Sequence, residues 1–296
     1  MTDSKIFIVG SRGQLGTELL KKYPNAKSAD ISELDITDKS SVKSFDWSGI
    51  DVIINAAAYT NVDGAETLEG RAMAWSVNAD AVANLVAVSA QHDITLVHIS
   101  TDYVFDGTND NHQEDETFAP LSVYGATKAA GDIVVSLAPK FYIVRTSWVI
   151  GEGNNFVKTM MNLAEKNISP TVVHDQIGRL TFTSELVRAI DHLINSQIAD
   201  SRNQNNTFTF GTYNVTNEGS SISWADITRE IYSLLGRDDL TVTNTTTEDY
   251  FKGKEGIAPR PLQSTLDLSK LQSTGFKSTN WQKDLLQYIN KEKEES

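Results

Sequence analysis

The feature that most constrains the fold is a series of three glycines near the start of the chain, at positions 10, 13 and 16. The apolar run Ile6–Val9 precedes the series, and a helical pattern of leucines follows it. A strand, a glycine turn and a helix in that order gather unpaired backbone N–H groups and the positive end of a helix dipole around one point, where they favour an anion. The series therefore predicts a diphosphate-binding turn, although the commoner spacing of that motif is G-x-G-x-x-G. The alternative is a tight turn whose glycines serve only packing.

Strand-like and helical patterns alternate over the first half of the chain. Strands are expected at residues 5–9, 27–30, 51–58, 94–99 and 141–145, and helices after Gly16, at 38–45, at 63–92 and from Ser122. The strands are mostly continuous apolar runs, which is typical of a parallel sheet covered on both faces. The pattern predicts an α/β protein with a Rossmann-like, doubly wound parallel sheet.

Beyond about residue 150 the alternation becomes irregular. A strand is expected at 171–173, helices at 183–195, 221–235 and from Trp281, a β-prone segment at 241–247, a polar insertion at 201–206 and a frayed tail at 291–296. These pieces predict a smaller, discontinuous C-terminal domain that binds substrate. We expect a dinucleotide-binding domain at 1–150 plus about 183–200, and the substrate-binding domain at about 151–182 and 201–296.

Composition excludes several kinds of chemistry. The chain has no cysteine, which rules out disulfides, thiol catalysis and metal sites with cysteine ligands. Its 26 lysines and arginines stand against 39 aspartates and glutamates, and the net charge of −13 opposes non-specific binding of nucleic acid. The chain has no apolar stretch of membrane-spanning length and no leader pattern at its start. We expect a soluble, cytoplasmic enzyme of small molecules that binds neither nucleic acid nor membranes.

Three side chains form the candidate catalytic group: Thr101, Tyr124 and Lys128. Tyr124 and Lys128 stand at positions i and i+4 of a predicted helix and therefore project from the same face. The pKa of tyrosine is ordinarily near 10, and a neighbouring ammonium group lowers it by favouring the phenolate. Thr101, at the end of a predicted strand, would orient the same substrate oxygen. A surface Tyr/Lys pair is the alternative, and the glycine turn upstream favours catalysis.

An acidic cluster follows the second predicted strand. Asp30 lies where doubly wound folds place a carboxylate that accepts hydrogen bonds from the adenine-ribose hydroxyls of a dinucleotide. Glu33 and Asp35 crowd the same stretch, so a solvated loop aspartate is an equal alternative. A carboxylate at this place repels a 2′-phosphate, and we therefore expect NADH to be used at least as well as NADPH. The small residues at 56–58 allow the loop backbone to lie against the cofactor.

Several motifs together resemble the extended short-chain dehydrogenase/reductase family. They are the glycine series, Asn55–Ala58, Ser100–Phe105, and the pair Tyr124 and Lys128. Further stretches resemble the members of that family that reduce dTDP-4-dehydrorhamnose: Thr60–Glu66, Arg145–Trp148, Gly153–Met160, Asp175–Gly178 and Arg260–Ser264. The resemblance spans residues 5 to about 290. It implies hydride transfer from NADH or NADPH to the 4-keto group of a dTDP-linked sugar, in the synthesis of dTDP-rhamnose and cell-surface polysaccharide.

The resemblance also implies roles for individual residues. Tyr124 is expected to donate the proton, and Lys128 to bind the nicotinamide ribose while lowering the pKa of Tyr124. The expected cofactor-binding residues are Gly10, Arg12, Gly13, Gln14, Leu15, Gly16, Asp30, Asp35, Ile36, Ala56, Ala57, Ala58, Tyr59, Asn78, Ser100, Tyr124 and Lys128. The expected substrate-binding residues are Val62, Asp63, Thr101, Asp102, Tyr103, Trp148, Asn155 and Arg260.

Two of these substrate residues have distinct expected tasks. Trp148 is expected to form an aromatic wall of the sugar site. Arg260 is the candidate cation for the substrate's diphosphate, because Pro259 and Pro261 restrict its backbone and reduce the entropy lost on binding. The alternative for Arg260 is a pairing with an acid that pins its loop.

The chain departs from the family pattern at two places. Leu180 stands where the family has proline. Some relatives dimerise around Mg²⁺; Glu18 and Glu185 match two of their ligands, but the C-terminal ligand has no counterpart near Trp281. We therefore expect no dedicated metal site, and either a monomer or a homodimer.

Two other functions are compatible with these motifs, and several notable residues are expected to have structural roles. An epimerase or dehydratase of the same fold would hold NAD tightly, and a non-catalytic regulatory homologue would keep the fold alone. His98, on an apolar strand, is expected to be a satisfied core residue, Trp224 to serve packing, and Glu114–Glu116 to form a solvated loop face.

Overall fold

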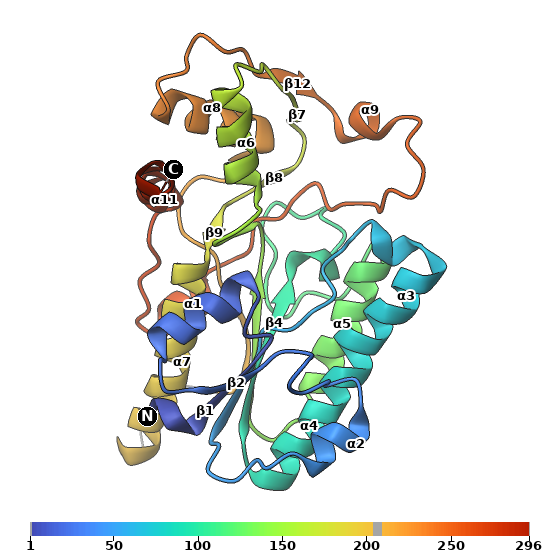
Figure 1. Cartoon of the computed structure of the whole chain (residues 1–296), viewed down its shortest axis with the longest axis vertical. Coiled ribbons are helices and arrows are strands. Elements are labelled where there is room, and N and C mark those ends of the chain that lie inside the picture. The colour runs from blue at the N-terminus through green and yellow to red at the C-terminus, as the bar shows by residue number, and fades with distance from the viewer. Residues whose placement is uncertain (1, 204–208, 296) are drawn as a thin grey trace.

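The computed structural model describes residues 2–203 and 209–295 (Figure 1). Its largest element is a six-stranded sheet in the order β10-β5-β4-β3-β1-β2, in which every neighbouring pair is parallel. The strands are β1 (Ile6–Val9), β2 (Lys27–Ala29), β3 (Val52–Asn55), β4 (Thr95–Thr101), β5 (Phe141–Thr146) and β10 (Gly211–Asn214). The chain leaves β1 toward β2 and then returns through β3, β4 and β5 in the opposite direction. The predicted doubly wound parallel sheet is confirmed.

Helices cover both faces of this sheet (Figure 1). They are α1 (Gln14–Lys22) and α7 (Thr183–Asn203) on one face, and α2 (Lys39–Ser44), α4 (Ala81–His92) and α5 (Val123–Val135) on the other. Within β1, Ile6 and Ile8 pack in the core beneath α1 and α7, whereas Phe7 and Val9 pack in the core beneath α2, α4 and α5. Successive side chains of a strand point to opposite faces, so burial of both faces requires a continuous apolar run.

The segment predicted as one helix over 63–92 is divided into four pieces. They are the 3-10 turn η2 (Gly64–Glu66), α3 (Leu68–Trp75), the π-helical turn η3 (Ser76–Asp80) and α4. Asn78 of the π turn is buried; its side chain accepts a hydrogen bond from Tyr59 N at 2.9 Å and donates to Thr127 Oγ1 at 3.1 Å. The wider turn thus directs a polar side chain at the loop after β3, as π turns near functional sites often do. A helical period in the sequence does not reveal such a turn.

A smaller body of helices and two-stranded sheets lies beyond the carboxyl ends of the large sheet (upper part of Figure 1). Its helices are α6 (Phe156–Glu165), α8 (Trp224–Leu234), α9 (Thr247–Phe251) and α11 (Trp281–Glu295). Its strands form three pairs: β6 (Val149–Ile150) with β9 (Thr181–Phe182), β7 (Thr171–Val173) with β12 (Thr243–Thr245), and β8 (Ile177–Gly178) with β11 (Ile222–Ser223). Val157, Ile231 and Trp281 are fully buried in its own core. Three short elements complete the described chain: η1 (Asp3–Lys5), η4 (Asp102–Val104) and α10 (Ser269–Ser273).

The C-terminal half differs from expectation in three details. Strand β10 pairs with β5 and completes the large sheet, although residues 201–296 were assigned to the smaller domain. Helix α7 continues to Asn203, so it takes in half of the expected polar insertion; residues 204–208 lie outside the described chain. The expected frayed tail is helical to Glu295. Its helix is held by an ion pair of Glu292 with Lys158 at 2.7 Å.

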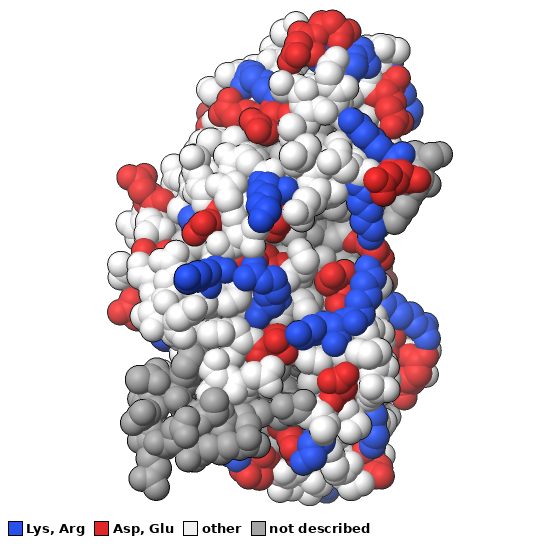
Figure 2. Space-filling view, turned by 90° about the vertical axis from the view of Figure 1, so that its left-hand side faces the viewer, with Lys and Arg blue, Asp and Glu red and all other residues white. Residues whose placement is uncertain are grey.

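Charges of both signs are interspersed on the surface that Figure 2 presents. Lysine and arginine side chains cross the middle of that face with acidic groups between and around them. Within residues 2–203 and 209–295, the structure has no helix that is both long and apolar enough to cross a lipid bilayer.

Candidate active site

The glycine turn between β1 and α1 is built by close backbone contacts. Gly10 has a φ of +76°, and a Cβ atom there would lie 2.6 Å from Ala57 N. A Cβ atom on Gly16 would lie 2.1 Å from the carbonyl oxygen of Gly10. Helix α1 begins after Gly13, and no described side chain caps its N-terminus. The free N–H groups of its first turn and the open approach over Gly13 fit a bound diphosphate.

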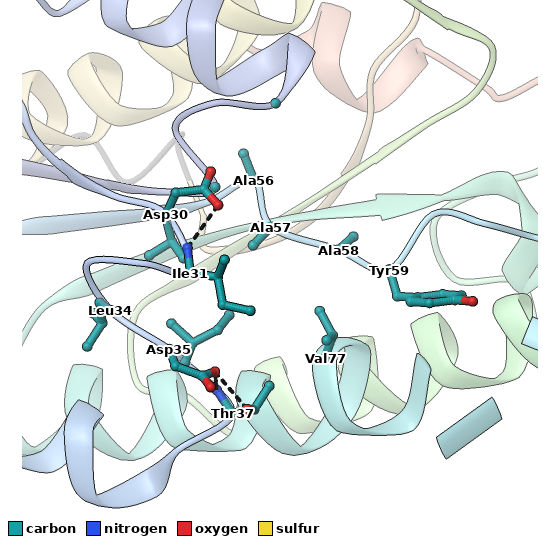
Figure 3. A pocket seen from close by; sticks show the side chains of 14 residues that line it. Asp30, Ile31, Leu34, Asp35, Thr37, Ala56, Ala57, Ala58, Tyr59 and Val77 are labelled. Carbon is teal, nitrogen blue, oxygen red and sulfur yellow. Dashed lines mark hydrogen bonds between the residues drawn. The ribbon is translucent and has the colours of Figure 1, made fainter. Parts of the chain in front are cut away.

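A pocket of about 320 Å³ opens beside this turn (Figure 3). It brings together many of the residues expected to bind the cofactor: Gly10, Gly13, Asp30, Asp35, Ile36, Ala56, Ala57, Ala58 and Tyr59. Five further lining residues were missed by the sequence analysis: Val9, Ile31, Leu34, Thr37 and Val77. Ile31 was predictable from the sequence, since it directly follows Asp30, the acid expected at the cofactor. In the structure its side chain is 71 % exposed. An apolar side chain so exposed at the rim of a pocket suits a flat aromatic ring such as adenine.

Asp30 joins the end of β2 to the glycine turn. Its carboxylate accepts hydrogen bonds from Arg12 N at 3.1 Å and from Ile31 N at 2.8 Å while bordering the pocket. Glu33 instead forms an ion pair with the Arg12 guanidinium, and Asp35 accepts hydrogen bonds from the backbone and hydroxyl of Thr37. Of the three neighbouring acids, Asp30 is therefore the one placed between the turn and the pocket.

The remaining residues expected at the cofactor have other surroundings. The Gln14 side chain donates to Asn154 O at 2.9 Å and so bridges from the turn to the segment before α6. Leu15 packs in the core between the sheet and α7. Asn78 holds the Tyr59 backbone, as described above, and Ser100 is buried near the end of β4.

The three candidate catalytic side chains come from the end of β4 and the start of α5. The Ser122 hydroxyl caps α5 by accepting a hydrogen bond from Gly125 N at 3.1 Å, which places Tyr124 in the first turn and Lys128 one turn later. Thr101 Oγ1 donates to Asp102 Oδ1 at 3.0 Å and accepts from Tyr103 N at 3.2 Å. All three predicted residues are nearly fully buried.

Burial controls the protonation of this group. It raises the pKa of Tyr124, and a hydrogen bond with Thr101 partly opposes that rise. Burial also lowers the pKa of Lys128 to about 8, against the attraction of Asp132. Lys128 Nζ donates to Ile99 O at 2.6 Å, and the expectation that Lys128 lowers the pKa of Tyr124 stays a prediction.

Asp102 also carries a displaced pKa. Its side chain is buried beside Thr101, and burial raises the pKa of the carboxyl to about 6. The nearby hydroxyl groups of Ser264 and Thr101 limit this rise, and Thr101 Oγ1 donates to Oδ1 at 3.0 Å. The carboxyl group therefore titrates near pH 6, well above an exposed aspartate.

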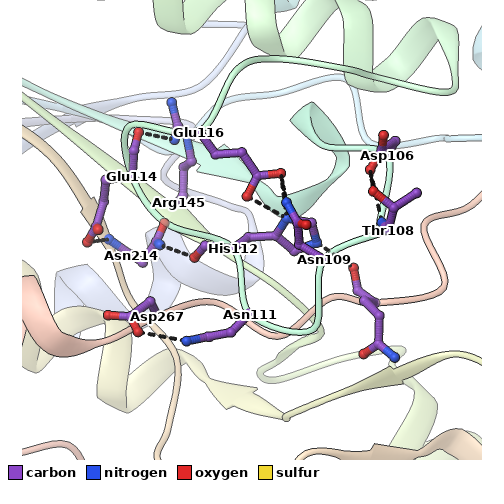
Figure 4. Close-up of polar contacts among 11 residues, drawn as sticks. Asp106, Thr108, Asn109, Asn111, His112, Glu114, Glu116, Arg145, Asn214 and Asp267 are labelled. Carbon is purple, nitrogen blue, oxygen red and sulfur yellow. Dashed lines mark hydrogen bonds and ion pairs between the residues drawn. The ribbon is translucent and has the colours of Figure 1, made fainter.

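A polar network fixes the loop between β4 and α5 (Figure 4). Both nitrogens of the buried His112 ring face oxygen atoms: Nδ1 lies 2.9 Å from the Glu116 carboxylate, and Nε2 lies 3.1 Å from Gln263 O. Glu114 accepts a hydrogen bond from Asn214 N at 3.0 Å. The expectation that Glu114–Glu116 forms a solvated loop face is therefore wrong for the two glutamates, because Glu114 binds the distant Asn214 and Glu116 binds His112 within the loop, whereas Asp115 is exposed.

Arg145 links this network to the helix that carries Lys128. Its Nε donates to Asp132 Oδ2 at 2.9 Å, and both side chains are at most 3 % exposed. Its Nη1 donates to Glu114 O at 2.9 Å, and its guanidinium lies over the rings of Phe105 and Phe118. A buried charge pair of this kind fixes geometry strongly, because the loss of either partner leaves a buried charge unpaired.

The candidate substrate residues Asp63 and Arg260 bind each other. Arg260 Nη2 lies 2.9 Å from both carboxylate oxygens of Asp63, and Asp63 also accepts a hydrogen bond from Ala258 N at 3.0 Å. The guanidinium lies 4.7 Å from the centre of the Phe251 ring. This is the acid pairing weighed as the alternative for Arg260, and it joins the loop after β3 to the loop after α9. Val62, next to Asp63, packs against the small buried cluster that contains Tyr124.

Trp148 is held in an unusual backbone conformation. Its φ is +49°, which is rare for a bulky residue and points to a constraint imposed by the surrounding structure. Its ring stacks on Trp224 at 3.7 Å, and a Cβ atom on Gly178 would lie 2.9 Å from it. Trp224 thus serves packing, as expected, and supports the ring expected to wall the sugar site.

Asn155 uses its side chain within the protein. Its Oδ1 accepts a hydrogen bond from Lys158 N at 2.9 Å and caps α6, and its Nδ2 donates to Gly151 O and the Tyr288 hydroxyl at 2.8 Å each. A substrate role for Asn155 remains a prediction, and the structure supplies a separate reason for an asparagine there.

The residues that match metal ligands in some relatives have protein partners. Glu185 accepts a hydrogen bond from Thr279 N at 2.9 Å and pairs with Arg188, and Glu18 pairs with Lys21 at 3.1 Å. In the described parts of the chain, no three or more His, Asp or Glu side chains gather as a metal would require. Leu180, in place of the family proline, is fully buried in the core of the smaller body.

Comparisons with known proteins agree with one another. Residues 4–294 match the family model of the RmlD substrate binding domain. The chain is 39% identical to the dTDP-4-dehydrorhamnose reductase of Aggregatibacter actinomycetemcomitans, over 95% of this chain and 97% of that protein. It also resembles the crystal structure of a dTDP-4-dehydrorhamnose reductase from Clostridium acetobutylicum, with a TM-score of 0.83, 38% identity, and coverage of 96% of this chain and 98% of that one. A dTDP-4-dehydrorhamnose reductase from Bacillus anthracis in complex with NADP gives a TM-score of 0.84, 34% identity, and coverage of 97% and 98%.

Proposed function

Because the chain belongs to the family of the RmlD substrate binding domain, we propose that it is an NAD(P)H-dependent dTDP-4-dehydrorhamnose reductase that forms dTDP-L-rhamnose. The observation that carries this proposal is the convergence of Thr101, Tyr124 and Lys128 at the carboxyl end of the sheet, on the same edge as the glycine turn. Ligands of doubly wound folds bind at that edge. The reaction serves cell-surface polysaccharide synthesis in the cytoplasm.

The cofactor fits the residues that surround the pocket. The uncapped first turn of α1 would hold the diphosphate, Asp30 the adenine ribose, and Ala56–Ala58 the flat backbone wall. A bound nicotinamide supplies the hydride. Asp30 favours NADH, while the exposed Arg12 beside it offers a cation for a 2′-phosphate, so we propose that both forms are used.

The side chains of the chain supply the proton. Tyr124 donates its phenolic proton to the 4-keto oxygen as that oxygen gains negative charge, and its raised pKa keeps it protonated at neutral pH. Thr101 orients the same oxygen through its hydroxyl. Lys128, as an ammonium at the nicotinamide ribose, stabilises the phenolate that remains. Burial of the group excludes water and strengthens each of these interactions.

The sugar nucleotide lies between the two bodies of the protein. Trp148 faces one side of the sugar, and Val62, Asp102 and Tyr103 line the side of the large sheet. The pair of Asp63 and Arg260 closes the far end, where Arg260 meets the diphosphate through the donors that Asp63 does not occupy. The division into a cofactor domain and a substrate domain remains part of this proposal, with β10 now added to the cofactor domain.

One turnover assay tests the function. Purified protein is mixed with dTDP-4-dehydrorhamnose and NADH, and then NADPH, and cofactor oxidation is followed beside product formation. Oxidation in step with dTDP-L-rhamnose formation supports the proposal. Protein that carries one tightly bound NAD per chain and leaves added cofactor unconsumed is an epimerase or dehydratase instead, and protein that binds cofactor without any turnover is a regulatory homologue.

A further inference from the structure

A buried asparagine and histidine lie against the candidate catalytic lysine. Asn55 ends β3, and His98 is its direct partner in the neighbouring strand β4. Both side chains are at most 1 % exposed. Lys128 approaches them because α5 carries Gly131 where a Cβ atom would lie 2.4 Å from Asn78 O and 3.5 Å from His98 Nε2. These contacts place three polar side chains together in a site that excludes water.

The hydrogen bonds around Asn55 determine which nitrogen of His98 carries the proton. Asn55 Oδ1 accepts a hydrogen bond from Ala57 N at 3.2 Å, and this bond fixes the orientation of the amide. Its NH₂ group therefore faces His98 Nδ1, at 3.1 Å. Because an NH₂ group only donates, Nδ1 must accept and cannot carry a proton. Burial lowers the pKa of His98 well below its ordinary value, so the ring is neutral and its single proton lies on Nε2.

That tautomer constrains Lys128. His98 Nε2 lies 3.3 Å from Lys128 Nζ, and Nζ already donates to Ile99 O at 2.6 Å. An ammonium group has three donors and no lone pair, so it would oppose the Nε2–H donor. A neutral amine donates to Ile99 O and accepts from Nε2–H at the same time. These contacts therefore favour the neutral amine over the ammonium.

We propose, on the basis of the proposed function, that Asn55 and His98 are positioning residues that favour the neutral amine of Lys128 over its ammonium until the cofactor ribose is bound. Binding of the ribose draws Nζ away from Nε2–H and lets the amine take one proton from solvent. The ammonium needed beside the Tyr124 phenolate is then retained to a higher pH in the occupied site. Above about pH 8, where the neutral amine predominates before binding, cofactor binding takes up one proton.

The charges that face Lys128 agree with this state. From its own helix, Asp132 favours the ammonium, but Asp132 is itself paired with Arg145 at 2.9 Å. Tyr124, one turn earlier, is neutral because burial raises its pKa. From β4, His98 presents a donor. The effect of burial exceeds the attraction of Asp132 and lowers the pKa of Lys128 to about 8. A further small shift of this pKa by His98 therefore changes the fraction of neutral amine near pH 8.

The first experiment reads the histidine tautomer without any turnover. The cofactor-free protein is labelled with ¹⁵N-histidine, and long-range ¹H–¹⁵N correlation spectra are recorded near neutral pH. His98 is assigned by comparison with Asn55→Asp, which alters the surroundings of that ring. We expect a neutral ring with a bare Nδ1 and a protonated Nε2. A protonated Nδ1, or a charged ring, would overturn the proposal.

The second experiment moves the His98 proton from Nε2 to Nδ1. In Asn55→Asp one carboxylate oxygen still accepts from Ala57 N, while the other accepts from the ring, so the His98 proton moves to Nδ1 and Nε2 becomes an acceptor for the lysine ammonium. NADH affinity is measured by fluorescence between about pH 6.5 and 9.5. In the wild type, affinity should fall up to ~10-fold per pH unit above pH 8, because binding takes up a proton. In the variant, the fall should begin about one pH unit higher.

A surface variant with the same charge change serves as control. Asn162→Asp adds one negative charge on an exposed position of α6 and should leave the tautomer and the pH dependence as in the wild type. NADH affinity that is independent of pH, or an equal shift in both variants, would overturn the proposal. If Asn55→Asp fails to fold, the His98 tautomer measured by NMR in the wild type still tests the proposal, and His98→Gln then serves to assign the His98 signals. Both readouts are independent of turnover, so a protein that lacks reductase activity yet shows them loses only the proposed function.

Discussion

Tyr124 is the residue on which the proposed chemistry most directly depends. We expect Tyr124→Phe to lose about 10²- to 10⁴-fold in kcat with the dTDP-linked keto sugar, because the proton donor is gone while the ring remains. NADH affinity should change little. The comparison variant is Tyr103→Phe, whose ring packs edge-on against Tyr124 at 5.5 Å in the proposed sugar site. Loss of its hydroxyl should change KM for the sugar nucleotide and leave kcat near that of the wild type, because it transfers no proton in the proposed mechanism. A rate near that of the wild type in Tyr124→Phe would contradict the assignment of the acid.

Asp102 makes stability depend on pH in a defined direction. Its folded pKa of about 6 lies above the ordinary value near 3.9, so the folded state binds the proton more tightly. The stabilisation from this proton is complete below the unfolded pKa and is lost as pH rises through about 6. Asp102→Asn does not titrate. Its unfolding free energy relative to wild type should therefore rise by about 1–3 kcal/mol between pH 4 and pH 8 in urea titrations. A difference that does not vary with pH would refute the shift.

At the level of residues, sequence spacing located the side chains that lie on one element. Tyr124 and Lys128 share a helix face because four residues make about one turn, and both are buried as a catalytic pair requires. The partners of Lys128 were not predictable in the same way. Asn55 and His98 meet only because β3 and β4 pair in one particular register, and a single sequence does not state that register. The same holds for Glu114, a loop residue whose partner Asn214 lies on the distant strand β10.

Among the elements, the glycine turn invites a test that separates folding from binding. Gly16→Ala should lower both Tm and NADH affinity, because its Cβ would lie 2.1 Å from the Gly10 carbonyl oxygen. The comparison variant is Gly13→Ala, whose Cβ would lie at an ordinary 3.4 Å from the same oxygen. It should keep the Tm of the wild type and lose NADH affinity alone, because its methyl group would enter the space of the diphosphate. Equal losses of Tm in the two variants would show that the turn tolerates no side chain at either position.

The elements that the sequence predicted well are those whose pattern reflects their own burial. Strands β1, β3, β4 and β5 are buried on both faces and are largely apolar runs, and all four were predicted. Strand β2 was also predicted, although Lys27 and Ser28 are exposed. Strand β10 was not predicted, since Gly211–Asn214 is short and polar and is a strand only through its pairing with β5. The π turn at Ser76–Asp80 was missed for a similar reason, because its hydrogen bonds respond to the loop it supports.

At the scale of the whole molecule, the pair of Asp63 and Arg260 connects the two bodies. If Arg260 meets the diphosphate, Arg260→Ala should raise KM for the sugar nucleotide about 10- to 100-fold, as expected for one charge-assisted contact of about 1.5–3 kcal/mol. Asp63→Asn, which loosens the pair but keeps the cation, should have a clearly smaller effect. NADH affinity should be unchanged in both. Equal effects of the two variants on KM would instead mean that Arg260 only pins the loop.

The place of β10 in the large sheet has a consequence for biosynthesis. A nascent chain leaves the ribosome from its N-terminus, so β5 emerges well before the strand that covers its outer edge. Residues 147–210 must be translated in between, which takes roughly 3–13 s at 5–20 residues per second. During that interval the edge of β5 has unpaired backbone groups that invite contact with other chains. Translation speed and chaperone access over that stretch should therefore influence the yield of native protein more than they do elsewhere in the chain.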